Sequence, residues 1–134
     1  MKGLSDGVID VIVSDHKPED EEKKRLTFAQ AETGASGIET LLPLSLELYH
    51  NGSVKLDILI KALTSNPAKI LKINKGNLSI GTDADFCIVD LNKPWIVKKE
   101  KLYSKSKNTS IENKKLQGKV TNTFVKGEEL FKLQ

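Results

Sequence analysis

The stretch IDVIVSDHKPEDEEKKR, Ile9 to Arg25, changes abruptly from apolar to charged residues. Residues 7–13 are β-branched and apolar almost throughout, a pattern typical of a strand buried on both faces in a parallel sheet that is covered by helices. The run stops at Asp15 and His16, and Pro18 blocks an early helix in the polar loop that follows. The pattern therefore predicts a strand whose carboxyl end carries two ionisable groups.

Helical periodicity follows this loop. Apolar residues recur at helical spacing in GIETLLPLSLELYHNG, and Asn51-Gly52 is expected to end that helix. Two short helices are predicted within residues 55–77, the second capped by Asn66 and begun by Pro67. The order strand, loop, helix predicts one βα unit.

The last third of the chain has the character of a β-structure. LSIGTDADFCIVDLNKPWIV predicts a turn, a strand, a break marked by Pro94 and a second strand. GKVTNTFVKGEELF predicts a hairpin with its turn at Lys126-Gly127. Cys87 is the single cysteine and lies within an apolar run, so it is predicted to be a small buried residue and not a nucleophile.

The composition of the chain limits the classes of function that it could have. The 134 residues suit one domain, and a net charge of +3 without an arginine-rich patch argues against nucleic acid as a partner. A single thiol rules out an internal disulfide framework and fits a reducing compartment. The sequence contains no signal peptide and no apolar segment of about 18 residues. We therefore predict a cytoplasmic protein that does not contact membranes.

Asp15 is the first candidate for chemistry. A carboxylate at the carboxyl end of a barrel strand can bind a metal ion or move a proton, whereas the alternative is an ordinary turn or helix-cap aspartate. His16 is expected to point to the opposite side, and His50 at a helix end is read as structural. Backbone N–H groups of Gly34 and Gly37 could hold an anion, but a plain glycine-rich connection is the favoured interpretation.

Five motifs in order resemble class I dihydroorotases of the cyclic amidohydrolase family, over nearly the whole chain. IDVIVSDHKPED resembles the last barrel strand with its TDHAPH-type motif, and EEKKRLTFAQAETGASGIETLLPL resembles the substrate loop and the helix with the GLET signature. SNPAKIL, GNLSIGTDADFCIVD and SKSKNTSIENKKLQGKV resemble the later elements of the family. The first motif is also similar to those of allantoinases and hydantoinases, and the last favours dihydroorotase.

The resemblance implies an α/β fold made of the last βα unit of an incomplete (β/α)8 barrel, followed by part of a small β-sandwich domain. Residues 1–75 are expected to be the barrel part and residues 76–134 the β-domain part. The implied reaction is the reversible cyclisation of N-carbamoyl-aspartate to dihydroorotate in pyrimidine biosynthesis.

The resemblance also implies roles for individual residues. Asp15 matches the family aspartate that binds zinc and carries a proton to the leaving amide nitrogen. Thr33 and Gly34 match positions whose backbone contacts the substrate ring. Glu19 stands where the family has a substrate-binding histidine, so its carboxylate should repel an anionic substrate unless a cation intervenes.

Most of the zinc site of the family has no counterpart here. The HxH pair, the carboxylated lysine and two further histidines of the family lie upstream of every motif in this chain, and one aspartate does not satisfy a zinc ion with about four ligands. The chain is therefore expected to be inactive and not to bind zinc stably by itself. It would act on a small cyclic amide only with a second chain that supplies the missing N-terminal part.

The alternatives are a non-catalytic remnant, a scaffold or partner of aspartate carbamoyltransferase, and a piece of another cyclic amidohydrolase. Exposed strand edges predict self-association.

Overall fold

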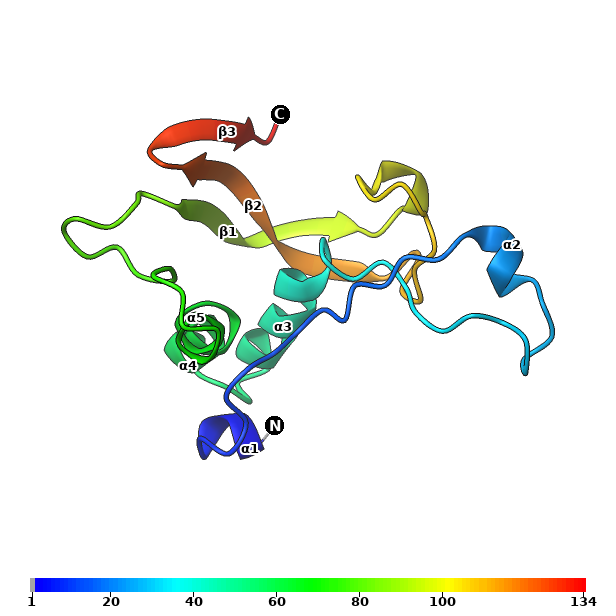
Figure 1. The fold of residues 1–134 in the computed structure, drawn as a ribbon, viewed down its shortest axis with the longest axis horizontal. Coiled ribbons are helices and arrows are strands. Elements are labelled where there is room, and N and C mark those ends of the chain that lie inside the picture. Colours follow the sequence, from blue (N-terminus) through cyan, green and yellow to red (C-terminus); the bar gives the residue numbers. More distant parts are fainter. Residues whose placement is uncertain (1) are drawn as a thin grey trace.

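The computed structural model describes residues 2–134 (Figure 1). The helices are α1 (Lys2–Ser5), α2 (Glu21–Lys24), α3 (Leu41–His50), α4 (Leu56–Leu63), α5 (Ser65–Ile70) and the 3₁₀ helix η1 (Lys99–Lys101). The strands are β1 (Phe86–Ile96), β2 (Lys115–Val125) and β3 (Glu128–Lys132). In Figure 1 the sheet lies above α3. The helices α4 and α5 lie beside α3, and α2 stands apart on a long loop.

The three strands form an antiparallel sheet in the order β1-β2-β3. The predicted hairpin is confirmed, because β2 and β3 are joined at Lys126-Gly127, two residues with positive φ as tight hairpin turns require. The expected break at Pro94 is partly right. The pairing of β1 with β2 shifts register between Asp90 and Pro94, where the proline has no N–H to donate, but β1 continues as one strand.

The three longer helices lie close to the predicted positions. α3 ends at Asn51-Gly52 as expected. α5 begins at Ser65, so the prediction that Asn66 caps it is wrong, and the Asn66 side chain instead donates a hydrogen bond to the Asp10 carbonyl at 2.9 Å. The longest helix, α3, has 10 residues, and no helix within residues 2–134 is long and apolar enough to cross a bilayer.

The packing of α3 joins the helical and the β parts. Its Leu46 is fully buried in a core with residues of α1 and α4, and its Leu44 packs against a second core formed by Val97, Leu102 and Leu116. Gly118 of β2 has a φ of 99°, and a Cβ there would overlap the end of Leu46. Close contact between helix and sheet therefore requires glycine at this position.

The strand predicted for residues 7–13 is not formed. This segment runs extended from α1 past α3 in Figure 1, but it pairs with no strand among the described residues. Val8 and Val13 are 77% and 72% exposed. A β-strand is defined by hydrogen bonds to a neighbouring strand, and residues 2–134 place none beside this segment.

Cys87 corrects a second expectation. It lies in the first half of β1, which pairs with β2, but it is exposed, and residues 86–90 around it are exposed or half-buried. Although the residue as a whole is exposed, neighbouring atoms partly desolvate the thiol, and this raises the pKa of Cys87.

Candidate functional site

Asp15 lies at the point where the extended N-terminal segment turns. Its φ of 45° is in the left-handed region, which aspartate tolerates better than most residues, and its side chain is exposed. With Gly34 it lines an open hollow of about 650 Å³. The walls of this hollow come from the extended segment, the glycine loop, α3 and the loop before β2, through Ile12, Val13, Ser14, Ala35, Ser36, Gly37, Thr40, Leu41, Leu44, Ser45, Leu48, Ser110 and Ile111.

His16 holds the glycine loop against the end of the extended segment. Its Nδ1 accepts hydrogen bonds from the backbone N–H groups of Gly37 at 3.1 Å and Ile38 at 3.3 Å. His16 also forms a parallel β-bridge with Ala35, and the N–H of Lys17 donates to the Ala35 carbonyl at 3.1 Å. The Gly37 N–H is therefore already used inside the chain, which favours the reading of this loop as a connection over that of an anion site.

Gly34 occupies a position that excludes a side chain. Its φ is 121°, and an added Cβ would overlap the carbonyl oxygen of Lys17. Its own carbonyl accepts a hydrogen bond from Asn108 Nδ2 at 3.0 Å, and the Asn108 carbonyl accepts one from Ser36 N–H at 2.8 Å. The loop before β2 thus fixes the orientation of the Gly34 peptide at the edge of the hollow.

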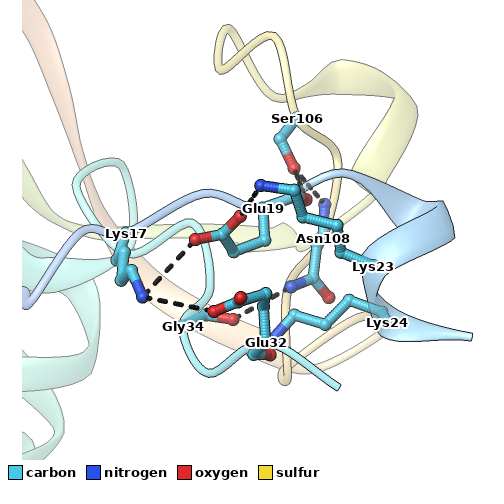
Figure 2. Close-up of polar contacts among 8 residues, drawn as sticks. All are labelled: Lys17, Glu19, Lys23, Lys24, Glu32, Gly34, Ser106 and Asn108. Carbon is cyan, nitrogen blue, oxygen red and sulfur yellow. Dashed lines mark hydrogen bonds and ion pairs between the residues drawn. The ribbon is translucent and has the colours of Figure 1, made fainter. Parts of the chain in front are cut away.

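Glu19 is the centre of a charged cluster shown in Figure 2. Its side chain is only 12% exposed, with Lys23 Nζ at 3.1 Å and Lys17 Nζ at 3.5 Å. The hydrogen bond from Lys23 is the main cause of a lowered pKa of the Glu19 carboxyl. Lys17 also lies 3.9 Å from Glu32. Two ammonium groups therefore neutralise the carboxylate that was expected to repel an anionic substrate.

Two backbone carbonyls also hold this cluster, and one of them ties it to the loop before β2. Ser106 Oγ donates to the Glu19 carbonyl and Lys24 donates to the Glu32 carbonyl (Figure 2). Sequence reasoning assigned no role to Ser106 or Asn108, although both lie in the SKSKNTSIEN run that carried part of the family resemblance. That run was the available signal, and its contacts with residues about 70 to 90 positions earlier could not be read from local pattern.

The structure therefore brings together only some of the predicted residues. Asp15 and Gly34 share the hollow, whereas Glu19 and Thr33 are not among the residues that line it. Thr33 is exposed.

The described residues do not by themselves fit a zinc centre. Within residues 2–134 no three His, Cys, Asp or Glu side chains converge in a way that could hold a metal ion. Asp15 offers one carboxylate, whereas catalytic zinc sites use about three protein ligands. We therefore derive no reaction step through a metal from this chain.

Comparisons with known proteins agree on one family. A sequence model described as the amidohydrolase family matches residues 1–130. The dihydroorotase of Ehrlichia canis (strain Jake) is 44% identical over 131 residues, which cover 98% of this chain and 29% of that protein. The dihydroorotase of Geobacter sp. (strain M21) is 41% identical over 96% of this chain and 30% of its own length.

Solved structures give the same result for the fold. The L-hydantoinase (dihydropyrimidinase) of Arthrobacter aurescens superposes with a TM-score of 0.91 at 31% identity, covering 97% of this chain and 30% of that one. Dihydropyrimidinase of Brevibacillus agri NCHU1002 has a TM-score of 0.91 at 21% identity over the same shares of the two chains. The chain thus spans about 30% of the length of the relatives it matches.

Proposed function

The chain belongs to the amidohydrolase family, and we propose that it contributes one acid and one backbone contact to a cyclic-amide hydrolase of the dihydroorotase type. The proposed reaction is the reversible cyclisation of N-carbamoyl-aspartate to dihydroorotate. Dihydroorotases 40% to 44% identical to nearly the whole chain support this substrate class over others.

One observation carries the proposal: Asp15 and the Gly34 peptide line the same hollow. A carboxylate beside the reacting amide can take a proton from the attacking oxygen and deliver it to the leaving nitrogen. The Gly34 peptide, fixed by Asn108, offers its backbone to the edge of an amide ring. These two contributions are a proton carrier and an orienting contact, and both belong to amide hydrolysis.

Residues 1–75 are proposed to be the end of a barrel, with residues 7–13 as its last strand, and residues 76–134 part of a β-domain. The fold comparisons support a piece of such an enzyme, because they match about 30% of each neighbour. α3 would join the two parts, since it packs against both cores.

The remainder of the active site is proposed to come from outside residues 2–134, in a partner that carries the missing N-terminal part. That partner would supply the zinc ligands that the family resemblance implies. The chain and its partner are proposed to work in the cytoplasm.

A second candidate is a non-catalytic remnant that serves as a scaffold, for example for aspartate carbamoyltransferase. The observation in its favour is that no metal-binding cluster exists within the described residues. A hydantoinase or allantoinase is the third candidate, supported by the hydantoinase structures, but the 31% identity of the nearest of the cited structures is below that of the dihydroorotases.

Co-production tests the proposal. The chain is produced together with the part of the Ehrlichia canis dihydroorotase that lies outside the matched 29%, and dihydroorotate hydrolysis and zinc content are measured for the pair and for each part. We expect activity from the pair alone. Asp15→Asn should lower kcat by about 10²- to 10⁴-fold, the usual contribution of a general acid-base group.

The control is Asp6→Asn, which changes an exposed aspartate next to α1 and should leave activity unchanged. Hydrolysis or stoichiometric zinc in the pure chain would contradict the division of the site between two parts. An inactive but correctly assembled pair would favour the scaffold candidate.

A further inference from the structure

A second hollow lies on the opposite side of α3 from Asp15. It has a volume of about 610 Å³ and is enclosed by the start of α3, the sheet and the region of η1. Successive residues of a helix are about 100° apart, so Leu42 and Pro43 of this hollow face away from Leu41 and Leu44 of the first one. The two hollows share no lining residue, and the proposed reaction gives the second one no role.

Aromatic rings are concentrated in this second hollow. The chain has one tryptophan, two tyrosines and four phenylalanines, and Trp95, Tyr103 and Phe131 all line it. Trp95 is half-buried, and its Nε1–H donates to the Gly118 carbonyl at 3.1 Å, which restrains the plane of the indole. Tyr103 and Phe131 meet edge to face, with ring centroids 6.4 Å apart. Rings that are restrained in this way offer flat apolar surfaces to a planar ligand.

Three lysines also line the second hollow, and their charges are not neutralised by the chain. Within residues 2–134, Lys98, Lys101 and Lys119 form no ion pair. Lys98 Nζ donates to the side-chain oxygen of Asn113 at 2.6 Å, and Lys119 Nζ lies 5.2 Å from the centre of the Trp95 ring. A cation beside an aromatic ring is thus already built into the wall.

One acid accompanies these lysines. Glu39 is the only carboxylate among the described residues that line the second hollow. Its Oε1 accepts a hydrogen bond from the backbone N–H of Ser104 at 3.1 Å, so this carboxylate already has a partner in the chain. Three positive charges against one negative charge favour an anionic ligand over a neutral or cationic one.

We propose that the second hollow binds a small planar aromatic anion, whose ring packs against the aromatic side chains and whose carboxylate or sulfonate lies beside Lys119. Its volume falls within the range of roughly 300 to 1,000 Å³ that small-molecule sites occupy, and a mainly apolar lining with a few charged groups is typical of such sites. A phosphate ion alone would leave the aromatic walls uncovered. The inference goes beyond the proposed function, because the site is separate from Asp15 and needs no reaction there.

Isothermal titration calorimetry of the unmodified chain tests this site with 2-naphthoate as the probe. The comparison ligands are 2-naphthalenemethanol, which has the same rings without the charge, and decahydro-2-naphthoate, its saturated and non-planar counterpart. We expect 2-naphthoate to bind at one site, about ten-fold more tightly than the alcohol because of the lysines and about five-fold more tightly than the saturated acid because of ring packing.

The single tryptophan gives a second and local readout. Because Trp95 is the only tryptophan of the chain, its indole N–H gives one signal in a ¹H–¹⁵N NMR spectrum. We expect this signal to shift as 2-naphthoate is added, with the same affinity as in calorimetry.

Matched lysine variants locate the charge that holds the probe. Lys119→Gln should weaken 2-naphthoate binding about five-fold, whereas Lys69→Gln, at an exposed lysine of α5, should change it less than two-fold. Both variants lose one positive charge, so an effect of net charge alone would appear equally in both. Lys101→Gln, in η1, should act in the same direction as Lys119→Gln without a change in the sheet. Circular dichroism checks that each variant is folded.

Four outcomes overturn the proposal: no binding of 2-naphthoate, equal binding of the alcohol or of the saturated acid, an indole signal of Trp95 that does not move, and equal effects of Lys119→Gln and Lys69→Gln. A dimer that excludes the probe, detected by sedimentation, would also overturn it, because a second copy of the chain would then cover the hollow. None of these measurements depends on hydrolase activity, so the site and the proposed reaction can fail separately.

Discussion

Residues 7–13 and the first half of β1 read alike in the sequence but differ in the structure. GVIDVIV and FCIVD are both short β-branched apolar runs, yet only the second forms a strand. β1 finds its partner β2 within the described chain, and the pairing is extended by the hairpin to β3. The comparison shows that composition indicates a tendency to form strands, while a hydrogen-bonding partner decides whether the strand exists.

The largest effect is expected where the helical part supports the sheet. Leu46→Ala removes a fully buried side chain that fills the space above Gly118, and we expect the free energy of unfolding to fall by about 3 kcal/mol. Urea denaturation followed by circular dichroism measures the change. Leu130→Ala in β3 is the control, since that leucine is 65% exposed and should cost less than about 0.5 kcal/mol. Equal losses of unfolding free energy in the two variants would mean that the sheet does not depend on the packing of α3 for its stability.

Substitution of one valine in each of the two regions tests the comparison directly. Val97 follows β1 and is fully buried, so Val97→Ala should lower the free energy of unfolding by about 2 kcal/mol through lost burial and a small cavity. Val13→Ala in the unpaired segment should change it by less than about 0.5 kcal/mol in the isolated chain. Thermal unfolding of the two variants under one buffer condition compares them. A large loss at Val13 would show that the segment is covered in solution.

The same contrast explains what could be predicted from the sequence. The hairpin turn, the end of α3 and the two short helices depend on residues close in the chain, and pattern was sufficient for them. The strand at residues 7–13 is not formed because no strand lies beside it within residues 2–134, and Cys87 is exposed because the described residues place no further layer over the start of β1, so in both cases the sequence pattern could not show which neighbours are present. Asp15 was identified because it ends an apolar run. Asn108 was missed because its contact with Gly34 joins loops 74 residues apart.

A smaller effect is expected at this contact between loops. Asn108→Ala removes the hydrogen bond to the Gly34 carbonyl, and we expect a loss of about 1 kcal/mol in the free energy of unfolding. The backbone bond from Ser36 to Asn108 remains in the variant. Amide exchange should therefore become faster around residues 33–35 and change less at residue 36.

The control for this change is Asn92→Ala, at an exposed asparagine whose side chain makes no hydrogen bond within the described part of the chain. It should alter neither stability nor exchange of the glycine loop. If amide exchange at residues 33–35 did not change in Asn108→Ala, the hydrogen bond from Asn108 would not be needed to keep the conformation of Gly34. Its backbone conformation and its close approach to the Lys17 backbone would then be sufficient.

The smallest effect is expected at Glu19, and it depends on pH. The hydrogen bond from Lys23 lowers the pKa of Glu19 in the folded chain below its ordinary value of 4.5. Since the folded state binds the proton less readily than the unfolded state, the carboxylate stabilises the fold above that ordinary pKa, and this stabilisation is lost as the pH falls through the lowered value.

Glu19→Gln removes this titration. Its loss of stability relative to the unchanged protein should therefore become smaller as the pH falls below the ordinary pKa of 4.5, and also with added salt because the cluster is partly exposed. Urea denaturation at several pH values measures the difference. Glu128→Gln, at an exposed residue of β3 with no ion pair among the described residues, should show no such trend. If the loss of stability in Glu19→Gln did not change with pH, the charge of Glu19 would not contribute to stability. The two lysines of the cluster in Figure 2 would then hold the loop through packing of their aliphatic stems.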